Sequence, residues 1–235
     1  RLRIDLDQAG AIAFRNNPAD WDFSDVGEYT FTVSAAINDT HGQWVGYSQP
    51  IFDFIEEVSG GKVTFDTFTG GELVESGLEY RSLMDGVIDI AAPIDIFFDP
   101  TYFPCGDFSC LPMTYSDPTV GSLAFADMVD SDWVMPSIGK TYTQYQFEDI
   151  GLHVLVPPIC NDLKICTTGI ELDSLDAFSK ININTSLQAH TIFAEQCGMS
   201  PVQFTVFELY DAMSRGAVNA TIQFIADWQA YGTQE

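Results

Sequence analysis

The chain has 235 residues and a mass of 26.0 kDa, which suits one large domain or two small lobes. Hydrophobic residues make up 46% of it, so a sizeable core can form. Its 34 acidic residues outnumber 9 basic ones, and the net charge of −25 argues against nucleic acid and anionic membrane surfaces as partners.

The first predicted elements follow a polar N-terminal extension, residues 1–27. The segment YTFTVSAA, which starts at Tyr29, alternates apolar and polar residues as a strand does. Apolar residues then recur every three or four positions from Trp44 to Val58, which predicts a helix with one buried face. Pro50 should kink this helix or shift its start.

The next elements continue the alternation of strands and helices. A second alternating strand spans 62–69, a helix stops at Gly86, and an apolar strand of the kind found inside parallel sheets spans 87–92. The order strand, helix, strand, helix, strand predicts an α/β sheet with right-handed crossovers.

The second half of the chain is predicted to be more broken. A helix is expected around 125–134, and an apolar strand over 152–158 would make His153 a core residue. Shorter elements follow, with strands at 163–168, 180–185 and 201–206 and helices at 186–197 and 208–215.

No catalytic or metal-binding motif occurs in the sequence. The three histidines have no metal-ligand spacing, and there is no nucleophile elbow, phosphate-binding loop or dinucleotide fingerprint. The chain is therefore predicted not to be an enzyme and to need neither metal nor cofactor. Cys105 with Cys110, and Cys160 with Cys166, either close small disulfide loops or remain buried thiols.

Five segments, in order, resemble the extracytoplasmic solute-binding proteins of TRAP transporters (the DctP type). They are FIEEVSGGKVTFDTFTGGEL at 54–73, LMDGVIDIA at 83–91, CLP at 110–112, SLDAFSKININ at 174–184 and GMSPVQFTVFELYDAMSRGAVNATI at 198–222. The resemblance implies a two-lobed periplasmic-binding-protein-like α/β fold, with mixed sheets flanked by helices that close on a ligand. The implied lobes are residues 28–158 and 159–235, with the family's C-terminal crossover elements missing.

The resemblance also implies where a ligand would bind, and here the sequence departs from the family. The family's cleft arginine, which forms a two-pronged salt bridge with a carboxylate, falls on Asn184, and a second arginine falls on Lys164. An acid that normally helps to hold the second lobe is replaced by Asn219. A bidentate carboxylate clamp is therefore not expected.

The candidate ligand-binding residues lie on loops after the ends of strands, where open α/β sheets place ligands. They are Asn38, His41, Glu75 and Asp95 in the first lobe and Lys164, Asn184 and Phe207 in the second. Four of them have a structural alternative: Glu75 suits a helix N-terminus, Asp95 a turn, Lys164 an ion pair and Phe207 a helix core.

Two functions are consistent with the sequence. The first is an extracytoplasmic solute-binding protein, periplasmic or extracellular, which captures a small polar ligand such as an organic acid for the permease subunits of a TRAP-type transporter. The second is a degenerate binding-protein fold that serves as an accessory subunit of a larger assembly without a ligand. The lost arginine and the early end of the chain favour the second function, and the ordered family segments favour the first.

Overall fold

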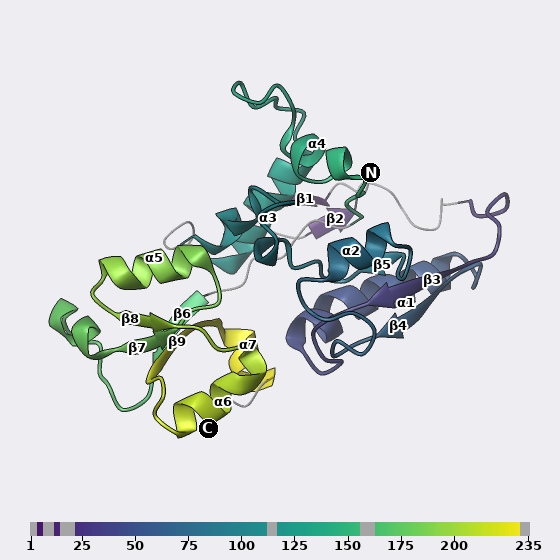
Figure 1. Ribbon diagram of the computed structural model, residues 1–235. Coiled ribbons are helices and arrows are strands. Elements are labelled where there is room, and N and C mark those ends of the chain that lie inside the picture. Colours follow the sequence, from purple (N-terminus) through teal and green to yellow (C-terminus); the bar gives the residue numbers. More distant parts are fainter. Residues whose placement is uncertain (1–3, 7–11, 15–21, 112–116, 156–162, 231–235) are drawn as a thin grey trace.

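The computed structural model describes residues 4–6, 12–14, 22–111, 117–155 and 163–230. Two separate α/β sheets are joined by a mainly helical segment that contains α3 and α4 (Figure 1). A short antiparallel hairpin, β1 (Ile4–Leu6) and β2 (Ile12–Phe14), lies within the predicted N-terminal extension. The architecture is the predicted two-lobed α/β fold. The residue boundaries of the lobes remain a prediction.

The first sheet has the strand order β4–β3–β5 and is parallel throughout. Its strands are β3 (Tyr29–Ser34), β4 (Val63–Phe68) and β5 (Ile90–Ala91). Helix α1 (Gln49–Val58) packs Phe52 against a cluster with Val33 and Trp44, so this core combines aromatic and aliphatic side chains. Helix α2 (Glu79–Met84) precedes β5.

Pro50 shifts the start of the first helix, as the sequence predicts. A π-helical turn, η2 (Trp44–Ser48), comes first, and the backbone N–H of Gln49 donates to the carbonyl of Trp44. Pro50 then occupies the first turn of α1, where no intrahelical partner is needed for its missing N–H.

The connecting segment differs most from the sequence-based expectation. The predicted helix at 125–134 is α3 (Pro118–Asp130), which starts earlier because the carboxylate of Asp117 accepts hydrogen bonds from the N–H groups of Thr119 and Val120. Short turns and helices surround it: η3 (Ile96–Phe98), η4 (Gly106–Cys110), α4 (Tyr142–Gln146) and η5 (Glu148–Ile150). Their core combines Ile96, Phe103, Phe125, Tyr142 and Phe147.

The strand predicted at 152–158 is absent from its described part, residues 152–155. His153 is exposed there, whereas Leu152 and Val154 pack against the aromatic cluster. The alternation of apolar residues therefore reflects packing against helices and not pairing in a sheet. Residues 156–158 lie outside the described part of the chain.

The second sheet is mixed, with the order β6–β9–β7–β8. Strand β6 (Leu163–Thr167) is antiparallel to β9 (Ala220–Phe224), whereas β7 (Asn182–Asn184) is parallel to β9 and to β8 (Ser200–Val202). Helices α5 (Gln188–Gln196) and α6 (Val206–Ser214) lie on opposite sides of this sheet (Figure 1). A 3-10 segment, η6 (Leu175–Lys180), precedes β7, and α7 (Ile225–Ala230) follows β9.

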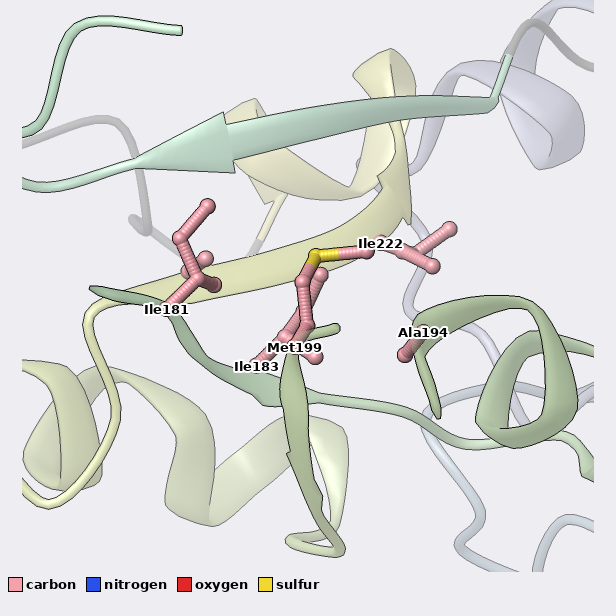
Figure 2. Packing of buried hydrophobic residues seen from close by; sticks show 6 residues of the cluster. Ile181, Ile183, Ala194, Met199 and Ile222 are labelled. Carbon is pink, nitrogen blue, oxygen red and sulfur yellow. The ribbon is translucent and has the colours of Figure 1, made fainter. Parts of the chain in front are cut away.

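The core of the second lobe is aliphatic. Ile181 before β7, Ile183 in β7, Met199 before β8 and Ile222 in β9 form a cluster with Ala194 of α5 (Figure 2). Ile183 is completely buried. Because Ile183 faces this cluster, its neighbour Asn184 faces the opposite side of the sheet, where α6 packs.

Two sequence-based expectations for this lobe need correction. The predicted strand at 201–206 is the shorter β8, because Thr205 caps α6 together with Glu208 in a reciprocal capping box. The central strand β9 and helix α7 were not predicted.

Candidate functional site

The loop after β3 places His41 against the other lobe. His41 is almost fully buried, and its Nε2 atom lies 3.0 Å from Oδ1 of Asp227 in α7. Helix α7 lies on the side of the second lobe that faces the first (Figure 1). Asn38 forms the turn that leads to this histidine, since its carbonyl accepts a hydrogen bond from the N–H of His41 at 3.1 Å.

Asp95, which follows β5, belongs to the same neighbourhood. The hydroxyl of Ser76 donates to Asp95 Oδ2 at 2.5 Å. Desolvation raises the pKa of Asp95, the Ser76 hydrogen bond opposes this shift, the carboxylate of Asp227 adds to it, and the charge of His41 opposes it. Asp95 is partly exposed.

Glu79, the first residue of α2, adds a third carboxyl group. Its side chain is only 2% exposed, and Oε2 accepts a hydrogen bond from the N–H of Gly77 at 2.8 Å. Burial raises the pKa of Glu79 to about 7, and the nearby charge of Asp95 contributes to the shift. The structure therefore joins His41, Ser76, Glu79, Asp95 and Asp227 into one group, which we call the acidic cluster.

The two positions of the expected arginines behave differently. Lys164 is exposed on the edge strand β6 opposite Gln223, four residues before Asp227. Asn184 is buried, and its Oδ1 accepts a hydrogen bond from the N–H of Phe204 at 2.7 Å. The side-chain amide of Asn184 thus holds the segment around Phe204, which leads into α6. Its Oδ1 atom is used in this hydrogen bond.

Two further predicted residues stand apart from the cluster in their described contacts. Glu75 is exposed, and its carbonyl accepts a hydrogen bond from the N–H of Leu78, as in the turn before a helix. Phe207 lies in the first turn of α6, and its side chain is outside the described part of the structure. The structure therefore brings His41 and Asp95 together, with Asn38 adjacent.

Sequence reasoning missed Ser76, Glu79 and Asp227. Ser76 and Glu79 follow Glu75 by one and four residues, and Glu75 was selected as the acid after the second strand. Asp227 lacked any signal, since neither β9 nor α7 was predicted.

The described residues contain no group of three or more His, Cys, Asp or Glu side chains placed to hold a metal ion. Cys105 is a free thiol, so it forms no loop with Cys110, and Cys160 lies outside the described residues. In the described part of the chain, no helix combines the length and apolar character that crossing a bilayer requires.

Several solved structures of solute-binding proteins share this fold. An extracytoplasmic solute receptor of Bordetella pertussis, DctP6, which binds pyroglutamic acid, matches with a TM-score of 0.71 and 14% identity over 88% of this chain and 64% of its own. A TRAP periplasmic solute-binding protein from Sulfitobacter sp. NAS-14.1, with bound β-D-galacturonate, matches with a TM-score of 0.69 and 12% identity over 87% and 65%.

A marine metagenome TRAP solute-binding protein specific for aromatic acid ligands gives a TM-score of 0.74 at 16% identity, covering 87% of this chain and 61% of its own. The chain thus spans 61 to 65% of the length of these three structures. A comparison with the curated proteins gave no match. The sequence profile of the bacterial extracellular solute-binding proteins, family 7 (DctP), matches residues 43–235. The chain belongs to this family of solute-binding proteins.

Proposed function

We propose that this chain is the extracytoplasmic solute-binding component of a TRAP-type uptake system. It would capture a small polar solute between its two lobes and present it to membrane permease subunits. The family match and the two-lobed fold favour this function over that of an accessory subunit without a ligand.

The contact between His41 and Asp227 is the observation that carries the proposal. It joins the loop after β3 in the first lobe to the helix that follows β9 in the second. Polar groups of the two lobes therefore meet at this contact, as is expected where a two-lobed binding protein closes on its solute.

Lys164 is the residue that we propose for an acidic group of the solute. It extends from the edge strand at the same end of the sheet as Gln223 and α7. An ammonium group supplies a point charge for a carboxylate, without the planar geometry of arginine. Structural neighbours hold pyroglutamic acid and galacturonate, which makes small organic acids the first class to test.

Isothermal titration calorimetry with the chain and a panel of organic acids, amino acids and polyols tests the function. Saturable one-to-one binding of at least one member is expected. Absence of binding across the whole panel would contradict the proposal.

Lys164→Ala sharpens the test. Because one charged hydrogen bond is lost, the affinity for an acidic solute is expected to fall by about ten- to a hundredfold. Lys180→Ala is the matched control, because Lys180 lies at the start of β7 and thus at the opposite end of the sheet. Equal affinities of the wild type and Lys164→Ala would remove Lys164 from the site.

A further inference from the structure

The acidic cluster contains three carboxyl groups and one basic side chain, that of His41. A lysine or arginine beside Asp95 or Glu79 would lower the pKa of that carboxyl group, yet both pKa values are raised. The carboxyl groups of the cluster therefore outnumber its basic groups.

His41 does not balance the three carboxyl groups. Its Nδ1 atom accepts a hydrogen bond from the N–H of Gln43 at 3.2 Å, and its Nε2 atom lies 3.0 Å from Oδ1 of Asp227. Desolvation raises the pKa of Asp95, and the charge of His41 lowers it by less, so the pKa stays raised. One imidazole beside three carboxyl groups leaves an excess of acidic groups.

Glu79 adds an observation that is independent of the acidic composition. Its Oε1 atom is buried and has no hydrogen-bond partner, whereas Oε2 is held by the N–H of Gly77. Gly77 adjoins Ser76, which binds Asp95, so the carboxyl group of Glu79 lies at the Asp95 side of the cluster. A buried oxygen without a donor is unfavourable, and a donor arriving with a ligand recovers this lost free energy.

We propose that the solute carries a protonated amine, which binds between Asp95, Glu79 and Asp227. The inference rests on the proposed solute-binding function and names the chemical class of the solute. An alkylammonium group has three N–H donors and no acceptor, which matches an acceptor-rich site with an unused carboxyl oxygen. With Lys164 on the second lobe, the site suits a zwitterion that has both an amine and an acidic group.

Binding of an amine should release protons. Asp95 and Glu79 hold their protons more tightly than free carboxyl groups because they are desolvated, and Asp227 lies close to Asp95. A cation among them favours the ionised forms. Affinity for an amine should therefore rise from about pH 6 to about pH 8, through the region where Glu79 titrates. His41 and Ser76, the other polar groups of the cluster, keep their hydrogen bonds in either state.

Matched pairs of solutes test the inference by calorimetry: glutamate against glutarate, 5-aminovalerate against valerate, and 1,4-diaminobutane against 1,4-butanediol. The amine of a pair is expected to bind at least about tenfold more tightly than its partner. Equal or tighter binding of the amine-free partner overturns the inference but leaves solute binding intact. Absence of binding for all pairs and for the wider panel contradicts solute binding itself.

Variants and buffers locate the effect. Asp95→Asn should lower the affinity for the amine by at least about tenfold and should not lower the affinity for its amine-free partner. Asp66→Asn, on the exposed face of β4, should change neither affinity. Titration in two buffers of different ionisation enthalpy should show net proton release in the wild type and less in Glu79→Gln. An amine that binds without proton release, or with undiminished affinity to Asp95→Asn, overturns the inference.

Discussion

The two lobes contain the same helix–turn–strand unit, although the sequence shows no evident repeat. In the first lobe α2 ends at a glycine with positive φ, Gly86, and in the second α6 ends at Gly216, with φ values of 69° and 70°. The residue after each glycine donates from its N–H to a helix carbonyl five residues earlier at 2.9 Å. Both are left-handed helix endings that glycine adopts without strain.

The comparison extends to the strand that follows each turn. Asp89 Oδ2 accepts from the N–H of Thr32 at 2.8 Å, and Asn219 Oδ1 accepts from the N–H of Asn182 at the same distance. Asn219 also donates from Nδ2 to the carbonyl of Lys180 at 3.1 Å. The turn thus needs one side-chain hydrogen-bond acceptor and not a charge. The amide of Asn219 adds a second hydrogen bond, to the carbonyl of Lys180.

This corrects one sequence-based expectation. Replacement of the usual acid by Asn219 was interpreted as the loss of a residue that holds the second lobe. The amide in fact forms hydrogen bonds to Asn182 in β7 and to Lys180, two residues before this strand.

The lobes differ most in the chemistry of their cores, and the largest predicted effect tests this difference. Ile183→Ala removes a completely buried side chain from the aliphatic core and should lower the free energy of unfolding of the second lobe by about 2 to 5 kcal/mol. Hydrogen exchange of the Ser200 N–H, which bonds to Ile181, should accelerate, whereas the Ala35 N–H in the first lobe should not. Equal acceleration of both would show that the lobes unfold as one unit.

The two glycine turns offer a matched pair of intermediate size. A Cβ atom at Gly86 or Gly216 meets nothing within 4 Å, so alanine introduces backbone strain without a clash. Gly86→Ala and Gly216→Ala should each cost about 1 to 2 kcal/mol, measured by urea unfolding. A cost that is negligible in one lobe and large in the other would break the equivalence of the turns.

The exchange of acid and amide should give the smallest and most asymmetric effect. Asn219→Asp loses the donor to Lys180 and places a carboxylate near that carbonyl, at a cost of about 1 kcal/mol. Asp89→Asn keeps the acceptor for Thr32 and should change stability by less than about 0.5 kcal/mol. Thermal unfolding of both variants measures the difference. Equal destabilisation would contradict the role given to the hydrogen bond between Asn219 and Lys180.

The sequence predicted elements whose pattern is local and missed those that depend on distant neighbours. Strands β3 and β4 alternate apolar and polar residues, and their pattern is sufficient. Strand β9 is central and buried on both faces, yet it contains Thr221 and Gln223, so its composition does not resemble a core strand. Tertiary pairing on both sides determines this strand, and a single sequence does not record that pairing.

The same limit applies to the site. His41 and Asp95 were predicted because each follows the end of a strand. Asp227 was missed because its contact with His41 joins residues 186 positions apart. The sequence did not predict an acidic cluster, although acids outnumber bases in the chain.

The connecting segment, with its aromatic core, constrains how the two lobes can move relative to each other. His190 in α5 donates from Nε2 to the carbonyl of Cys110, and the hydroxyl of Tyr80 in α2 donates to the carbonyl of Ile150. The connecting segment is therefore hydrogen-bonded to both lobes. Opening must either break one of these hydrogen bonds or move the connecting segment together with one lobe. The motion is thus closer to rotation of one lobe against a packed segment than to free rotation about two flexible linkers.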